Sequence, residues 1–145
     1  MIAAERWRGN WLAVGPADAV RVKVDRARPT RRAQARAIRN LPAGTPVVLS
    51  ASGRGAIRRC RYVASRAGVV LEREFIAVPS AAAPAYLVEN ARGPVEVFLR
   101  TLLVTPPGTP FAGVVDIALG AVRALSPWRL IRVLVPGRVL VGRCA

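Results

Sequence analysis

The chain has 145 residues, 52% of them hydrophobic, and a formal net charge of +15. This length and apolar content are typical of one folded domain and argue against wholesale disorder. The sequence has no histidine and only two cysteines, which excludes catalysis by a histidine base and makes a zinc site of the Cys/His type untenable.

The positive charge is concentrated in the first part of the chain. Residues 1–66 carry 15 basic and 3 acidic side chains, whereas residues 67–145 carry 8 and 5. Such a concentration attracts phosphate-rich partners, an anionic membrane or an acidic protein, and the alternative is a solvated face. The sequence shows neither the apolar core of a signal peptide nor a membrane-spanning stretch. We therefore expect a cytoplasmic protein, with a peripheral position at a membrane as a variant.

Two short β-like runs open the predicted fold. They are Trp11–Val14 and Ala19–Val24, and a Gly-Pro turn separates them. The valines of the second run alternate with Arg21 and Lys23, so one face is apolar and the other basic. We expect the two runs to form a hairpin or to lie beside the strand that begins at Pro46.

A basic helix is predicted next, over Arg31–Asn40, with Thr30 as its N-cap. Ala33, Ala37 and Ile38 give this helix a thin apolar face. Three of its arginines recur at i, i+4 and i+7, which places their guanidinium groups in one row and indicates a phosphate-contacting surface. The row consists of Arg32, Arg36 and Arg39.

The clearest fold signal is a unit of strand, turn, helix and strand. An apolar run predicts a strand over Pro46–Ser52, and Ser52 is placed to cap a helix over Arg54–Ala67. Gly68 supplies a left-handed stop, and Val69–Val78 resumes strand-like sequence. This succession predicts an α/β layer. The residues expected on the apolar face of the helix are Ala56, Ile57, Cys60, Val63, Ala64 and Ala67.

Three other groups of residues could in principle bind a ligand or catalyse a reaction, but a structural role is the favoured interpretation of each. Gly53–Gly55 could offer backbone N–H groups to an anion, but it has neither the P-loop lysine nor a dinucleotide-binding pattern and is interpreted as a plain turn. Glu72 and Glu74 are expected on one face of a strand, where they answer nearby arginines rather than act as an acid/base pair. Cys60 and Cys144 are interpreted as buried thiols rather than as a disulfide.

The remainder of the chain is predicted to be short and mostly helical. Ala85–Val88 has the pattern of an edge strand, and a helical face begins at Val95. Phe111–Leu125 is a mostly apolar helical stretch, and the region 111–135 that contains it either covers the sheet or lies at a membrane interface, with Trp128, Arg129 and Arg132 at the headgroups.

We therefore predict a single α/β domain over residues 1–145, a small mixed sheet with packed helices. Its expected parts are a basic N-terminal part (1–66), a helical apolar insertion (about 94–135) and a last strand (about 138–142).

Several stretches share the pattern of a known family. They are Leu41–Val48, the helix with Arg58 and Arg59 and its continuation Ala67–Glu74, Val78–Val88, and Leu125–Arg143. Together these stretches resemble the later half of class I S-adenosylmethionine-dependent methyltransferases. They are similar in particular to actinobacterial proteins of this type that are linked to cell-surface polysaccharide pathways. The likeness covers about residues 41–143 and implies a truncated, Rossmann-like half of that fold.

The part of the family pattern that binds the cofactor is missing from this sequence. In the family a glycine-rich loop follows the first strand, and no GxGxG precedes Leu41 here. Asp25 ends a strand-like run, but no such loop comes before it, so no cofactor-binding residue is carried over. The resemblance therefore implies an accessory or partner-completed subunit, which has S-adenosylmethionine only where a protein partner supplies the missing half.

Three functions follow from these observations. The first is the methyltransferase-like accessory subunit, for which no catalytic residue is assigned. The second is a basic module that binds nucleic acid or another polyanion, and the third is a peripheral protein at an anionic membrane surface; none of the three uses a metal. The residues expected to contact the polyanion are Arg31, Arg32, Arg36, Arg39, Arg58, Arg59 and Arg61.

Overall fold

The computed structural model describes residues 14–78, 80–82, 84–102, 111–125, 135 and 137–145. The chain divides into two compact units, one of residues 1–87 with 135–145 and the other of residues 88–134. The second unit overlaps the helical insertion predicted at about residues 94–135.

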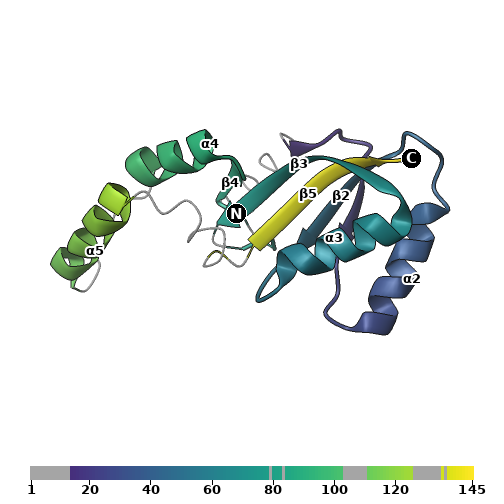
Figure 1. Cartoon of the computed structure of the whole chain (residues 1–145), viewed down its shortest axis with the longest axis horizontal. Helices are drawn as coiled ribbons and strands as arrows, with labels where there is room; N and C mark the ends of the chain where they lie inside the picture. The colour runs from purple at the N-terminus through teal and green to yellow at the C-terminus, as the bar shows by residue number, and fades with distance from the viewer. Residues whose placement is uncertain (1–13, 79, 83, 103–110, 126–134, 136) are drawn as a thin grey trace, which may run out of the picture. The chain divides into compact units, whose positions relative to one another are not determined.

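The described residues form a mixed α/β structure, as predicted (Figure 1). Five strands make one open sheet in the order β1-β2-β5-β3-β4. The elements of the first unit are β1 (Val20–Lys23), α2 (Arg28–Arg39), β2 (Pro46–Ala51), α3 (Ala56–Ala67), β3 (Val69–Val78) and β5 (Gly137–Cys144), and the boundary between the units falls inside β4 (Tyr86–Glu89).

Strand β5 is inserted between two strands that follow one another in the chain. β1 runs parallel to β2. Of the two arrangements expected for the run Ala19–Val24, a hairpin or a place beside the strand that begins at Pro46, the structure shows the second. β5 is antiparallel to β2, with Pro46 opposite Arg143, and antiparallel to β3, with Val69 opposite Cys144. β2 and β3 are therefore parallel to each other, with the last strand between them.

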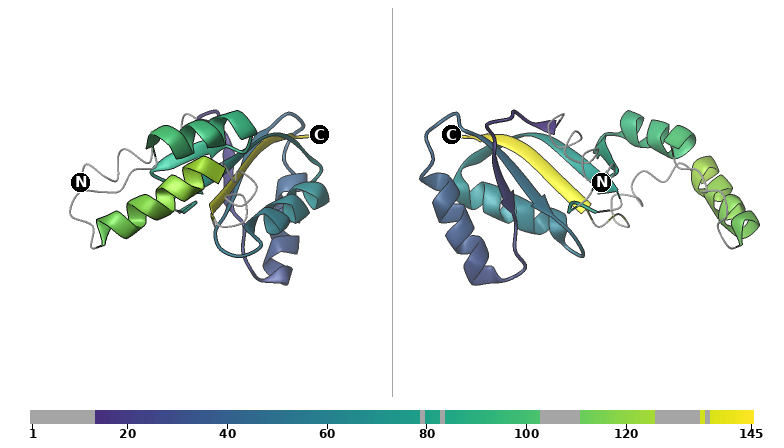
Figure 2. Two further views of the ribbon diagram at one scale, coloured as in Figure 1. Left: turned by 60° about the vertical axis from the view of Figure 1, so that its left-hand side comes forward. Right: turned by 180° about the vertical axis from the view of Figure 1, so that it is seen from behind.

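Helices α2 and α3 cover one face of this sheet (Figure 2). The apolar face predicted for α3 is confirmed, since its alanines, Cys60 and Val63 are buried and Ile57 packs against them. The core on this face includes Ile38 and Ala35 from α2, Leu49 from β2 and Leu140 from β5. A second buried cluster lies on the opposite face: Val14, Ala19, Val48, Phe75, Ala77, Ala81, Val139 and Val141.

Helix α2 begins one turn earlier than predicted. Its N-cap is Ala27, so Thr30 lies inside the helix. The earlier start follows from Pro29, whose fixed φ suits the first helical turn. The Asp25 carboxylate also accepts a hydrogen bond of 2.8 Å from the Ala27 backbone N–H and so organises the turn before the helix.

The apolar face of α2 differs from the expected one in two positions. Ala35 and Ile38 are buried, whereas Ala33 and Ala37 are exposed. The cause is the anchoring of the helix to the end of β1, where the Gln34 side chain donates to the Lys23 carbonyl at 2.8 Å. The neighbouring Ala35 is thereby directed to the sheet, and the predicted face rotates.

Helix α3 starts after a left-handed turn rather than with a serine cap. Gly55 is the N-cap residue, with φ 72°, and Gly53 also has positive φ, a conformation that favours glycine. The Ser52 hydroxyl instead accepts a hydrogen bond of 3.1 Å from the Ala81 N–H. Gly68 ends α3 in the left-handed conformation, as predicted, with φ 74°.

The second unit is helical in its described part. α4 (Arg92–Val97) continues into the π-helical turn η1 (Phe98–Leu102), and α5 spans Ala112–Leu125. These helices agree with the predicted helical patterns, and Val95 is among the buried residues.

Two sequence expectations are only partly covered by the described chain. Of the β-like run at Trp11–Val14, residues 11–13 lie outside the described residues, and Val14 is buried and helical rather than extended. In the part of the chain that the structure describes, the helices are too short or too polar to cross a membrane.

Candidate anion-binding site

Helix α2 carries the predicted row of three arginines on its exposed side. Arg32, Arg36 and Arg39 recur at i, i+4 and i+7, and all three are exposed. Burial of Ala35 and Ile38 against the sheet fixes the rotation of the helix about its axis. The arginine row therefore lies on the solvent-exposed surface of α2, on the side next to α3.

Helix α3 completes a hollow beside this row. The hollow has a volume of about 230 Å³. None of the residues that line it is acidic, and four of them are arginines, so it concentrates positive charge in a small space. The lining residues are Arg32, Ala35, Arg36, Arg39, Tyr62 and Arg66.

Two guanidinium groups lie over the Tyr62 ring. The Arg31 and Arg66 guanidinium carbons each lie 5.8 Å from the centre of its ring, within cation–π range. The hydroxyl oxygen is enclosed, and no group among the described residues meets hydrogen-bond geometry with it. The tyrosine is thus fixed through its ring while its polar end is left without a partner.

The surrounding arginines also change the acidity of Tyr62. The interaction of its hydroxyl with Arg32 is the main cause that lowers the pKa of Tyr62, with a smaller contribution from the charge of Arg66. Burial opposes this shift. The Arg32 guanidinium lies outside hydrogen-bond geometry with the hydroxyl, and its positive charge favours the ionised form of Tyr62. The direction of the pKa shift indicates a local potential that favours negative charge.

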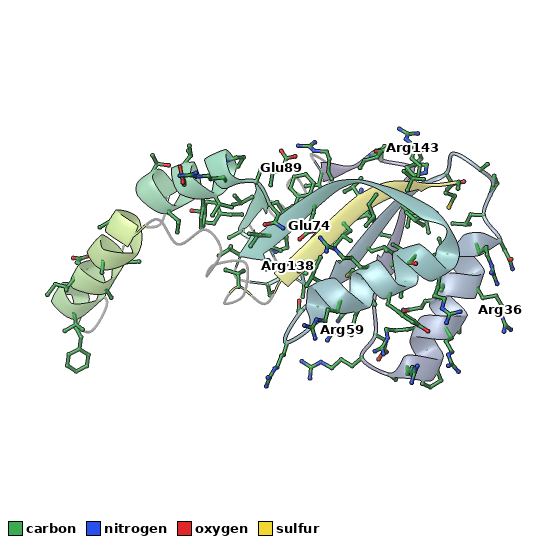
Figure 3. The ribbon with its side chains drawn as sticks, in the orientation of Figure 1. Arg36, Arg59, Glu74, Glu89, Arg138 and Arg143 are labelled. Atoms are coloured by element: carbon green, nitrogen blue, oxygen red, sulfur yellow. The ribbon has the colours of Figure 1, made fainter. Side chains whose placement is uncertain are left out.

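Two of the other predicted arginines, Arg59 and Arg61, are occupied elsewhere. Figure 3 shows that Arg59 lies at the start of α3 and apart from Arg36. Arg59 donates to the Ser52 and Arg54 carbonyls at 2.7 and 2.6 Å. Arg61 pairs with Glu74 at 2.9 Å. These arginines stabilise the fold locally. Of the remaining two, Arg31 donates to the Arg26 carbonyl and contacts Tyr62, whereas Arg58 is exposed and does not line the hollow.

Sequence reasoning missed Tyr62 and Arg66. Both lie on α3, four residues apart, so they share one side of the helix. A tyrosine one turn before an arginine, at the flank of the apolar face where Tyr62 packs against the core, is the signal that could have found them. Their approach to α2 depends on helix packing, which the sequence pattern does not specify.

The two glutamates of β3 form salt bridges with different arginines. Glu72 sits at a β-bulge between Leu71 and Arg73 and pairs with Arg143 at 3.0 Å, whereas Glu74 pairs with Arg61 of α3. Cys144 packs in the core under helices α2 and α3. Because successive residues of a strand point to opposite faces, the Arg143 side chain lies on the face away from these helices. The expectation that Glu72 and Glu74 share a face is therefore wrong, and the bulge is the cause. Their interpretation as partners of arginines is confirmed.

Cys60 and Cys144 are free and buried, which confirms the prediction of two buried thiols rather than a disulfide. Burial raises the pKa of the Cys60 thiol to about 12, and it also raises that of Cys144. Among the described residues, no cluster of three or more histidine, cysteine, aspartate or glutamate side chains could hold a metal ion. The hollow between α2 and α3 thus holds the best-defined group of candidate site residues in this part of the chain.

Comparison with known proteins gives no relative for this chain. No family model, no curated protein and no solved structure matches it.

Proposed function

We propose that the face formed by α2 and α3 binds nucleic acid, a polyanion, through its phosphate groups. The observation that carries this proposal is the convergence of four arginines on one hollow with no acidic residue in its lining. Arginine guanidinium groups bind phosphate oxygens in a planar, two-pronged geometry, and their charge is fixed at all accessible pH values. The surplus of basic residues in the first 66 positions supplies the long-range attraction.

The mode of binding is backbone contact rather than base reading. The aromatic ring in the hollow, that of Tyr62, already has guanidinium groups of Arg31 and Arg66 against it. It is therefore a poor platform for a stacked base, which is how single-stranded nucleic acids are commonly gripped. Contacts to phosphates carry little sequence information. We expect affinity for nucleic acid with weak dependence on its sequence.

Salt dependence tests this function directly. Binding of a fluorescent single-stranded oligonucleotide is measured by anisotropy as sodium chloride is raised. Each phosphate neutralised contributes about −0.7 to the slope of log affinity against log salt concentration. Replacing the row by Arg32→Gln, Arg36→Gln and Arg39→Gln together should weaken binding strongly and reduce the slope by about two.

The matched control removes the same charge outside the hollow. It combines Arg21→Gln, Lys23→Gln and Arg54→Gln, whose side chains are exposed. This control should lose less than half as much slope as the α2 variant. Equal losses in the two variants would show a diffuse charge effect instead of a binding face, and salt-insensitive binding would contradict the proposal altogether. Flotation with vesicles containing acidic lipids, run in parallel, decides whether a membrane competes for the same face.

A second candidate function rests on the sequence resemblance and on the α/β class of the sheet. β5 is antiparallel and lies between β2 and β3, which are parallel to each other and to β1. The sequence resembles the later half of class I methyltransferases over about residues 41–143, and the mixed sheet belongs to the α/β class that this resemblance implies. This supports an accessory subunit that a partner completes, although a fold by itself does not assign a function.

Calorimetric titration with S-adenosylmethionine tests this second candidate. The chain alone should give no binding heat, since no glycine-rich cofactor loop precedes its predicted half. The chain together with a protein encoded in a neighbouring reading frame, where that protein carries such a loop, should give saturable heat. Binding by the isolated chain would contradict the accessory role, and no binding by the pair would remove this candidate.

A further inference from the structure

The hollow between α2 and α3 offers hydrogen-bond donors and lacks acceptors. Its polar side chains are Arg32, Arg36, Arg39, Arg66 and Tyr62, and its remaining lining residue is Ala35. An arginine side chain has five N–H donors and no acceptor. The chemistry that complements such a lining is a compact group made of acceptor oxygens.

The Tyr62 hydroxyl belongs to the same set of polar groups that line the hollow. Its oxygen is enclosed and has no hydrogen-bond partner among the described residues. Its neighbours in the hollow can donate to it but cannot accept its proton, because they are arginines. Buried polar groups in proteins are nearly always hydrogen-bonded, so an acceptor oxygen that entered as the surrounding arginine side chains shift would satisfy this phenol.

Size and charge narrow the ligand to one phosphate group. The hollow, at about 230 Å³, is smaller than most pockets for drug-sized molecules. A phosphate monoester presents three acceptor oxygens and a charge of about −1.5 to −2 near neutral pH. A phosphodiester within a nucleic-acid chain presents two free oxygens and a single charge. Four guanidinium groups and a hydroxyl therefore match the monoester better than the diester.

We infer that this hollow is a site for a terminal phosphate monoester, held by Arg32, Arg36, Arg39 and Arg66 with the Tyr62 hydroxyl as an added donor. This inference rests on the proposed function, because the same face supplies the phosphate contacts. It adds that a chain end bearing phosphate is preferred over the interior of the polymer. The guanidinium groups against the Tyr62 ring fix the hydroxyl in place for that contact.

The experiment compares two oligonucleotides of the same sequence, one with a 5′-phosphate and one without. Anisotropy is measured with the full chain at a pH of about 7.5, where the monoester is largely dianionic. We expect the phosphorylated oligonucleotide to bind about tenfold more tightly, since it gains charged hydrogen bonds. Inorganic phosphate should remove this preference by competing for the hollow.

Variants locate the preference. Tyr62→Phe keeps the ring and removes the hydroxyl, so the ratio of the two affinities should fall to about twofold or less. Arg36→Gln removes a guanidinium from the exposed side of α2 and should lower the ratio as well, which keeps the test valid if the tyrosine variant does not fold. Arg54→Gln, which removes a charge outside the hollow, should leave the ratio unchanged.

The outcomes separate this inference from the proposed function. Equal affinity of the two oligonucleotides would overturn the monoester site while nucleic-acid binding stands. Binding of inorganic phosphate with no binding of the unphosphorylated oligonucleotide would overturn the nucleic-acid function and leave the monoester site. A preference that survives both Tyr62→Phe and Arg36→Gln would place the phosphate elsewhere and overturn the assignment of the hollow.

Discussion

Arg59 and Arg58 are neighbours on α3 with opposite structural roles. The Arg59 guanidinium donates to two carbonyls of the turn that precedes the helix, those of Ser52 and Arg54, whereas Arg58 is exposed. Replacing Arg59 by methionine keeps the length of the side chain but leaves two carbonyls without their donor. We expect Arg59→Met to lower the free energy of unfolding by about 2 kcal/mol, measured by urea denaturation.

Arg58→Met is the matched control for this prediction. It removes the same charge one residue away and should change the free energy of unfolding by less than about 0.5 kcal/mol. Similar destabilisation by both variants would mean that Arg59 acts through net charge and not through the turn.

Cys60 makes stability depend on alkaline pH. Burial, partly offset by the charge of Arg59, raises the pKa of its thiol from 9.0 to about 12. The unfolded chain therefore releases this proton near pH 9, while the folded chain retains it. Stability is complete below pH 9 and is lost as pH rises from 9 toward 12, by at most about 1.4 kcal/mol per pH unit.

Urea denaturation of the native chain and of Cys60→Ala between pH 8 and pH 10.5 measures this effect. The variant starts from a lower free energy of unfolding, because it opens a small cavity, but its loss with rising pH should be shallower. Taking the difference of the two slopes cancels the contributions of all other groups. Parallel slopes would show that the thiol ionises normally in the folded chain.

At the level of elements, β5 depends on glycine for its approach to β3. A Cβ built at Gly142 would meet the Val70 carbonyl oxygen and lie 2.9 Å from the Val69 side chain. Backbone atoms cannot give way as a flexible side chain can, so alanine at this position forces the two strands apart. We expect Gly142→Ala to lower the midpoint of urea denaturation by an amount equivalent to about 1–3 kcal/mol.

Gly93→Ala provides the comparison for Gly142→Ala. Gly93 lies in α4 with open space around its Cα, and alanine is the better helix former. Its substitution should be neutral or slightly stabilising. If the two variants unfold alike, the close approach of β5 to β3 is not what limits stability.

At the scale of the whole molecule, the local order of elements could be predicted from sequence and their spatial order could not. The strand at Val69–Val78 and the glycine at its start follow from β-branched content and a left-handed stop, which are local signals. The position of β5 between β2 and β3 depends on pairing between distant residues, such as Pro46 with Arg143, which has no local signature. The bulge at Glu72 escaped prediction for the same reason.

The candidate site also has a part that the sequence predicts and a part that only the packing of the helices creates. The row Arg32, Arg36 and Arg39 could be read from its helical spacing, because all three residues lie on one element. Tyr62 and Arg66 join them only through the packing of α3 beside α2. Arg59 was assigned to the polyanion-binding set because charge alone does not reveal that its guanidinium binds backbone carbonyls.

The place of β5 has a consequence for the order in which the chain folds during synthesis. β2 and β3 leave the ribosome early, and each presents an unpaired edge until β5 arrives to bond with both. The closing contacts join residues far apart in sequence, which slows folding relative to a sheet of adjacent strands. The nascent chain is therefore most exposed to aggregation between the emergence of β3 and that of β5. A truncation that removed β5 would leave the sheet divided into two parts.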